Sequence, residues 1–219
     1  ADFYGLMLVA TNDNLVAAHQ EPTTHSELLK WTGIVVAMAL AGDVGPRKNY
    51  WAMADNGVRV AQNFGARFGM TRHRWDLIEK HMSFVPASEI DINTRLDPWW
   101  EVRPLVHGFN AHWPKVLVTS HILCVDESMI KWKGAELSKG NKHGAPHVTK
   151  MKGKPVPIGI MFKNTACGVC GIMVFIEIVE AKAAMREKEK LVPGSSHTTA
   201  TTLRLVQNWF GTGNIVLGD

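Results

Sequence analysis

The feature that most constrains the fold is a change in the spacing of the apolar residues about halfway along the chain. In the first half, apolar residues recur at helical spacing in segments 25–42, 70–85 and 99–117. In the second half, short apolar runs rich in branched residues alternate with polar or glycine-containing turns, which is typical of strands. We therefore expect an α+β protein, with a mainly helical region over residues 1–117 and a sheet-containing region over residues 118–219.

The second region contains four candidate strands and one candidate helix in the order β-β-β-α-β. The candidate strands are residues 121–126, 154–162, 167–180 and 214–219, and the helix is residues 194–213. The first three strands can form a meander of hairpins. The helix can then cross back with the usual right-handed connection, which would place the last strand parallel to the first.

Two of these candidate strands end in an aspartate, Asp126 and Asp219. If the first and last strands are neighbours, both side chains lie at one edge of the sheet, where the ligands of open α/β sheets bind. Two carboxylates held together favour a divalent cation such as Mg²⁺, and a pair of such ions can cleave a phosphodiester bond. Aspartate is also a common turn residue after a strand, so this pattern leaves both interpretations open. Glu127 is expected to point away from Asp126, because side chains alternate along a strand.

Basic residues are concentrated between the two aspartates. Segment 131–163 contains eight lysines and one acidic residue, Glu136, whereas the whole chain of 219 residues has a net charge of only +4. Such a segment is either a solvated loop or a surface that binds a polyanion such as nucleic acid. Because it adjoins the candidate metal site, we expect phosphate contacts from five of its lysines, which are Lys131, Lys133, Lys150, Lys152 and Lys154.

The cysteines and the apolar stretches indicate the type of compartment. There are three cysteines, an odd number that implies no disulfide framework and favours an intracellular, reducing compartment. Cys167 and Cys170 have the spacing of half a zinc site, but no second half follows, so we expect both to be buried thiols of a strand. The longest uncharged apolar stretch, residues 31–42, is too short to span a bilayer, and no membrane partner is expected.

Several stretches, in collinear order over essentially the whole chain, resemble the piggyBac family of DNA transposases and the cellular proteins derived from them. The segment LCVDESMIKWKG (123–134) is similar to the region around the family's first catalytic aspartate. KMKGKPVPIGI (150–160) resembles the strand that follows, and NIVLGD (214–219) resembles the strand that ends in the second catalytic aspartate. Upstream, WTGIVVAMALAG, NYWAM and MTRHRWDLIEKHMSF follow the order of the family's helical region.

The resemblance implies a partial RNase H-like core in which Asp126 and Asp219 are the first two members of a carboxylate triad that binds two Mg²⁺ ions. It also implies a nuclear protein that acts on double-stranded DNA, both transposon ends and target DNA. The helical region would serve in dimerisation, giving a homodimer, and in DNA binding.

The family's third catalytic carboxylate is expected beyond residue 219. We therefore expect the sequence to be a fragment that is inactive by itself, whereas the intact protein cleaves DNA and transfers strands. The alternative is a domesticated module that binds DNA or chromatin without catalysis.

Overall fold

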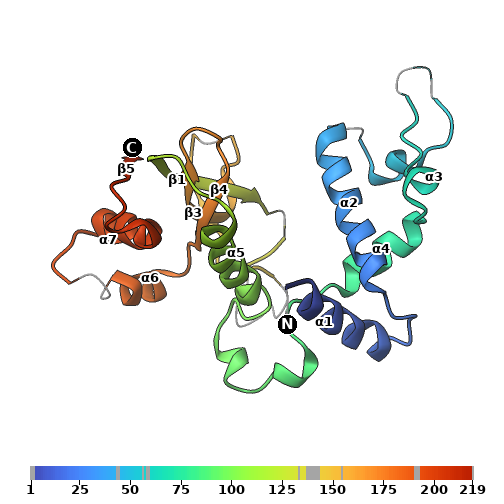
Figure 1. The fold of residues 1–219 in the computed structure, drawn as a ribbon. Coiled ribbons are helices and arrows are strands. Elements are labelled where there is room, and N and C mark those ends of the chain that lie inside the picture. The colour runs from blue at the N-terminus through green and yellow to red at the C-terminus, as the bar shows by residue number, and fades with distance from the viewer. Residues whose placement is uncertain are drawn as a thin grey trace. The chain divides into compact units, whose positions relative to one another are not determined.

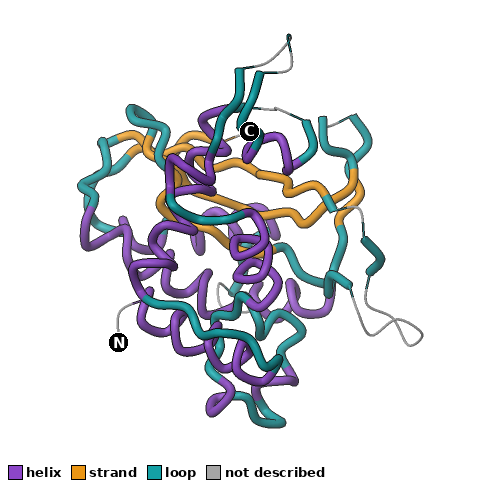
Figure 2. Tube along the Cα trace, turned by 90° about the vertical axis from the view of Figure 1, so that its right-hand side faces the viewer, coloured by secondary structure: helices purple, strands orange, loops and turns teal. Residues whose placement is uncertain are grey.

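The computed structural model describes residues 3–42, 45–55, 57, 60–132, 134–136, 144–153, 155–189 and 193–218. The chain divides into two compact units, Ala1–Pro104 and Leu105–Asp219. All the described strands belong to the second unit, and the first unit is built from helices and loops (Figure 2). Among the described residues, no helix combines the length and the hydrophobicity that crossing a membrane requires.

The described residues of the first unit form four α-helices and three short 3-10 helices. Figure 1 shows their arrangement within the unit. The α-helices are α1 (Phe3–Ala17), α2 (His25–Ala41), α3 (Phe64–Phe68) and α4 (Arg72–His81), and the 3-10 helices are Arg47–Trp51, Ala87–Glu89 and Thr94–Leu96. The helices predicted over 25–42 and 70–85 correspond to α2 and α4. The side chain of Thr24 caps α2 and that of Thr71 caps α4, each by accepting a backbone N–H of the first turn.

Aromatic side chains form the core of this unit. Phe64, Trp75 and Ile78 are buried together, and Trp31 of α2 stacks on Trp75 of α4 with ring centroids 5.3 Å apart. The Trp31 indole N–H also donates to the carbonyl of Trp75 at 3.2 Å. The apolar periodicity seen in the sequence therefore corresponds to the faces on which α2 and α4 meet.

The second unit is built on a five-stranded mixed sheet. Its strands are β1 (Ile122–Lys131), β2 (Thr149–Lys150), β3 (Ile158–Cys167), β4 (Met173–Ile178) and β5 (Ile215–Gly218). β3 pairs antiparallel with β1 on one side and with β2 and β4 on the other, and β5 runs parallel to β1. The predicted meander and the parallel placement of the last strand beside the first are therefore confirmed.

The first strand is longer than predicted. β1 does not end at Asp126 but continues to Lys131, because β3 pairs with it over this whole length. Charged residues can remain inside the ladder because Glu127 lies directly opposite Lys163 and forms an ion pair with it. The apolar run that precedes Asp126 is thus only the first half of a strand, in which Leu123 is fully buried, and the second half ends with the exposed Ile130 and Lys131.

The predicted third strand is interrupted by a turn. Residues 168–172 connect β3 to β4, with a turn at 168–170, so the strand predicted over 167–180 is confined to β4. As a result, only Cys167 is buried, whereas Cys170 is exposed. The prediction that both are buried strand thiols is wrong for Cys170.

Helices α5 (Arg103–Val116), α6 (Lys182–Glu189) and α7 (His197–Leu205) complete this part of the chain. The Asn110 amide of α5 donates to the carbonyl of Ile176 in β4 and accepts from its N–H, both at 2.8 Å. The two compact units divide between Pro104 and Leu105, in the first turn of α5. α7 is the predicted crossing helix, capped by Ser196, and a 3-10 helix, Gln207–Trp209, follows it.

Candidate active site at the edge of β1 and β5

Asp126 lies in the middle of β1, at the point where the parallel strand β5 ends. Val125 pairs with Gly218, the last described residue of the chain. Asp126 is exposed, and its Oδ1 accepts a hydrogen bond from the backbone N–H of Glu127 at 2.7 Å. Asp219, the second predicted site residue, lies outside the described residues. The predicted pairing of the first and last strands is confirmed. That the two aspartate side chains lie close together stays a prediction.

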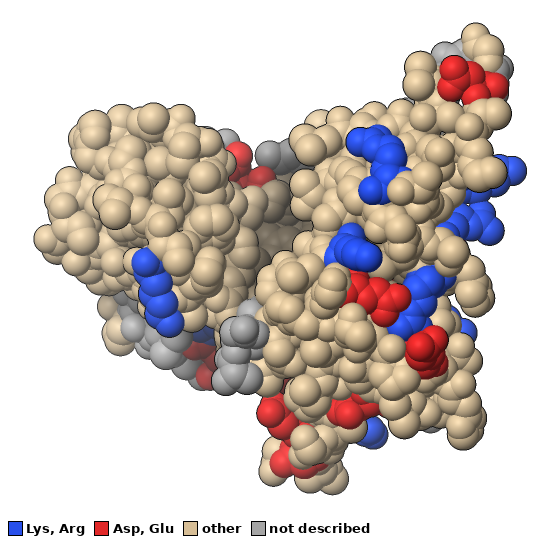
Figure 3. All heavy atoms as spheres, turned by 45° about the vertical axis from the view of Figure 1, so that its right-hand side comes forward, with Lys and Arg blue, Asp and Glu red and all other residues tan. Residues whose placement is uncertain are grey.

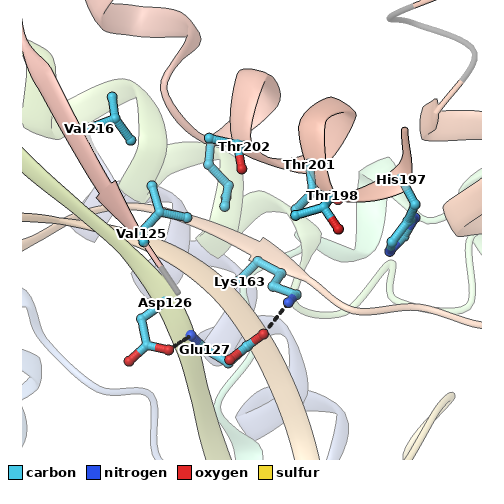
Figure 4. Close-up of a pocket in the computed structure, with 11 residues that line it drawn as sticks. Val125, Asp126, Glu127, Lys163, His197, Thr198, Thr201, Thr202 and Val216 are labelled. Carbon is cyan, nitrogen blue, oxygen red and sulfur yellow. Dashed lines mark hydrogen bonds and ion pairs between the residues drawn. The ribbon is translucent and has the colours of Figure 1, made fainter. Parts of the chain in front are cut away.

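A cavity of about 330 Å³ lies between this edge of the sheet and α7. Its walls come from β1, β3 and β5 on one side and from His197, Thr201 and Thr202 of α7 on the other. Figure 4 shows Lys163 reaching toward Glu127 on the α7 side of β1, whereas the Asp126 carboxylate is turned to the other side of the strand. Glu127 therefore points away from Asp126, as the strand alternation predicts.

A row of alternating charges crosses the sheet on the α7 side. Glu127, Lys163 and Glu177 occupy directly opposite positions on β1, β3 and β4. Arg204 of α7 extends the row by donating from Nε and Nη2 to the two carboxylate oxygens of Glu177 at 2.9 and 3.0 Å. The side chains of Arg204 and Glu177 are only 9% and 12% exposed. This buried pair fixes α7 on the sheet.

A hydrogen bond between β3 and α7 supports the same contact. The Thr165 hydroxyl donates to the carbonyl of Leu205 at 2.8 Å, and both residues are fully buried. Sequence reasoning did not identify this docking surface. The signal in the sequence is the presence of Lys163 and Glu177 inside apolar strands, because a charge in such a position needs a partner.

The chemistry of Asp126 fits a hard divalent cation. Its Oδ1 is held by the Glu127 N–H, and Oδ2 has no hydrogen-bond partner among the described residues. Mg²⁺ prefers such oxygen ligands and keeps several of its waters. The part of the chain that the structure describes contains no group of three His, Cys, Asp or Glu side chains that could hold a metal ion.

Three of the five lysines predicted to contact phosphate lie at one end of the sheet. Lys131 ends β1 and Lys150 ends β2, and these strands flank the start of β3. Both side chains are exposed, as is that of Lys152. Lys133 and Lys154 lie outside the described residues. The sheet topology thus gathers lysines that are distant in the sequence.

The helical unit shows a different distribution of charge. On its visible face, basic and acidic side chains are interspersed (Figure 3). Arg47, for example, forms ion pairs with Asp76 and Glu79. Glu27 forms two hydrogen bonds with Arg74, at 2.7 and 2.8 Å, and these bonds lower the pKa of that carboxyl group. These basic residues are engaged with carboxylates, unlike the lysines at the end of the sheet.

The protein family described as Transposase IS4 matches residues 1–219. A solved structure described as "Cryo-EM structure of piggyBac transposase synaptic complex with hairpin DNA (SNHP)" has a TM-score of 0.64 and 15% sequence identity. The match covers 99% of this chain and 47% of that chain, so the present chain spans about half the length of the solved one. No curated protein gives a match.

The likeness to the solved structure is a likeness of fold. It agrees with the sheet order β2-β3-β1-β5 and with the parallel pairing of β1 and β5. The predicted α+β class with an RNase H-like core is confirmed, and so is the predicted resemblance of this fold to that of a piggyBac transposase.

Proposed function

This chain belongs to the Transposase IS4 family, and we propose that in the intact protein it supplies part of a metal-dependent core that cleaves DNA and transfers strands. The observation that carries the proposal is the position of Asp126, an exposed carboxylate on β1 at the point where β5 ends. The solved structure of similar fold is a piggyBac transposase in a complex with hairpin DNA. That complex supports double-stranded DNA as the partner of this chain.

In this proposal, Asp126 and Asp219 are metal ligands. Bound Mg²⁺ supplies Lewis-acid chemistry, which activates the attacking oxygen and stabilises the leaving oxygen of a phosphodiester. Glu127 does not substitute for Asp126, because its carboxylate is paired with Lys163 on the opposite side of β1. Two aspartates alone do not complete the ligand set of two ions, so we expect a polypeptide of residues 1–219 to bind DNA without cleaving it.

The lysines at the end of the sheet would hold the DNA backbone. Lys131 lies roughly 16 Å along β1 from Asp126 at the usual rise of a strand. About five base pairs of duplex cover this distance. Because side chains alternate along a strand, Lys150 shares the face of Asp126, whereas Lys131 shares the face of Glu127. In this proposal, a duplex on the Asp126 face contacts Lys150 while a phosphate beside Asp126 is cleaved, and Lys131 and Lys152 reach its backbone from the end of the sheet.

We expect the 219-residue chain to bind double-stranded DNA with an affinity that falls steeply as salt is raised. In the double variant Lys150→Ala/Lys152→Ala, the slope of log K against log salt concentration should decrease by about 1–2, because each lost phosphate contact releases about one counterion fewer. Fluorescence anisotropy with a labelled duplex over a range of salt concentrations measures this slope.

The matched control is Lys182→Ala/Arg186→Ala, which removes the same charge from exposed positions of α6. This control should leave the slope close to that of the wild type. A wild-type slope in the Lys150→Ala/Lys152→Ala variant would show that these lysines do not contact phosphates.

The alternative function is that of a domesticated module that binds DNA or chromatin. It also predicts DNA binding by the lysines, but it predicts no DNA cleavage. Such a module would bind DNA in its intact form without cutting it, so a Mg²⁺-dependent nicking assay separates the two functions. The predicted nuclear location and homodimer are part of the same proposal, and both stay predictions.

A further inference from the structure

The turn Cys167-Gly-Val-Cys170 holds a thiol pair that DNA cleavage does not use. Its ends are joined by a hydrogen bond from the Gly171 N–H to the Cys167 carbonyl at 2.9 Å. Gly168 donates to the carbonyl of Ile122 at 2.9 Å, and a Cβ added to Gly168 would lie 2.7 Å from the Ile122 side chain. The turn is therefore packed tightly against the start of β1. Cys167 is 4% exposed, whereas Cys170 is exposed.

Hydrogen-bond donors surround the sulfur of Cys167. The Ser120 N–H donates to it at 3.4 Å, and the thiol itself donates to the Ser120 hydroxyl oxygen at 3.5 Å. The backbone N–H groups of Cys170 and Val169 also favour the charged form of this sulfur. These contacts, led by that of Cys170, lower the pKa of the Cys167 thiol to about 6. Because the thiolate is the reactive form of cysteine, Cys167 is prepared for exchange at neutral pH.

The backbone of the turn brings the two cysteines close together. The Gly171 N–H donates to the Cys167 carbonyl at 2.9 Å, which closes the turn and brings Cys170 back toward Cys167. Turns bring residues at positions i and i+3 within about 7 Å, which overlaps the Cα separations found in disulfides. Zinc is the other common use of this spacing and needs four ligands. Among the described residues, no group of three His, Cys, Asp or Glu side chains could hold a metal.

We propose that Cys167 and Cys170 form a thiol–disulfide exchange site that a small-molecule disulfide oxidises. The exposed Cys170 thiolate attacks the small disulfide, releases one thiol and becomes a mixed disulfide. The Cys167 thiolate then attacks the Cys170 sulfur, forms the intramolecular disulfide and displaces the second thiol. In total, the dithiol loses two electrons and two protons, and the small disulfide is reduced to two thiols.

The exchange site lies beside the starts of β1 and β5, whereas Asp126 lies where β5 ends. Ser120 lies two residues before the first residue of β1, and its carbonyl accepts a hydrogen bond at 2.8 Å from the amide of Asn214, which immediately precedes β5. Oxidation removes the thiolate that accepts the Ser120 N–H. The redox state of the turn therefore acts on the residue that joins the starts of β1 and β5.

The test uses the 219-residue chain and oxidised glutathione as the small disulfide. We expect mass spectrometry of peptides at pH 7 to find Cys167 bonded to Cys170, with Cys124 remaining a free thiol. The Cys167→Ser variant should stop at a stable glutathione adduct on Cys170, whereas the Cys124→Ser control should form the same disulfide as the wild type. Circular dichroism verifies that each variant is folded. An unresolved Cys170 adduct in the wild type would overturn the proposal.

The pH dependence of the closing step tests the same site. The pKa of the Cys167 thiol is lowered to about 6, so the rate of closure should change little between pH 7 and pH 9 and should fall only as the pH drops below about 6. Stopped-flow release of glutathione from the Cys170 adduct measures this step. A closing rate that rises about tenfold between pH 7 and pH 8 would contradict a thiolate at Cys167.

Discussion

In an Asp126→Asn variant of the intact protein, the rate of Mg²⁺-dependent DNA cleavage falls by about a thousandfold or more. This decrease corresponds to a loss of about 4 kcal/mol of transition-state stabilisation. The amide is nearly the same size as the carboxylate but carries no negative charge, so it is a poor ligand for a hard cation. Asp126 is exposed and takes no part in the ion pairs that hold the sheet to α7. We therefore expect the variant to remain folded and to bind DNA with nearly unchanged affinity.

The matched control for this variant is the neighbouring residue. Glu127→Gln removes a carboxylate one position away, on the opposite side of β1, where it pairs with Lys163. This change should reduce cleavage by less than about tenfold, because Glu127 acts only through the packing of the sheet. Cleavage of a labelled DNA end at several Mg²⁺ concentrations measures both variants. An Asp126→Asn protein that cleaves like the wild type, or a Glu127→Gln protein that is equally defective, would contradict the assignment.

The second large effect concerns stability. Arg204→Ala should lower the free energy of unfolding by about 3–5 kcal/mol, because it leaves a buried carboxylate without its partner. The carboxylate left unpaired is that of Glu177, which accepts both hydrogen bonds from the Arg204 guanidinium. The Arg204 side chain is only 9% exposed, so water cannot easily replace it. Urea unfolding followed by circular dichroism measures the difference.

Two further variants separate the unpaired charge from lost packing. Replacing both partners, in Glu177→Leu/Arg204→Met, should recover most of the lost stability, because no uncompensated charge remains in the interior. Arg186→Ala on the exposed surface of α6 should change stability by less than about 0.5 kcal/mol. If Arg204→Ala lowers the free energy of unfolding by less than about 1 kcal/mol, the pair of Arg204 and Glu177 does not hold α7 on the sheet.

The order of the strands could be predicted from the sequence because each apolar run is short and bounded by turn residues. The parallel neighbourhood of β1 and β5 followed from the right-handed crossover rule together with the helix between them. The end of β1 could not be predicted in this way. Its extension past Asp126 depends on the length of β3 and on the pairing of Glu127 with Lys163, and both are set by a register that the separate segments do not reveal.

The parts that were missed involve contacts between distant residues. α6 is short and consists mostly of charged and small residues, so its one large apolar residue, Met185, gives a weak signal in the sequence although it is buried. Arg204 meets Glu177 only after α7 has docked on the sheet. The turn at Cys167 did have a local signal, because Gly168 and Gly171 flank the second cysteine and glycines commonly mark turns. The apolar residues around them favoured a continuous strand instead.

The most direct test of the central claim, that Asp126 is a metal ligand at the end of β5, is the binding of Mn²⁺ to the 219-residue chain. Mn²⁺ takes the same oxygen ligands as Mg²⁺, and electron paramagnetic resonance measures its free concentration. We predict that the wild-type chain binds Mn²⁺, that Asp126→Asn and Asp219→Asn each weaken binding by about tenfold or more, and that Glu127→Gln does not. Equal Mn²⁺ affinity in the wild type and in Asp126→Asn would contradict the claim.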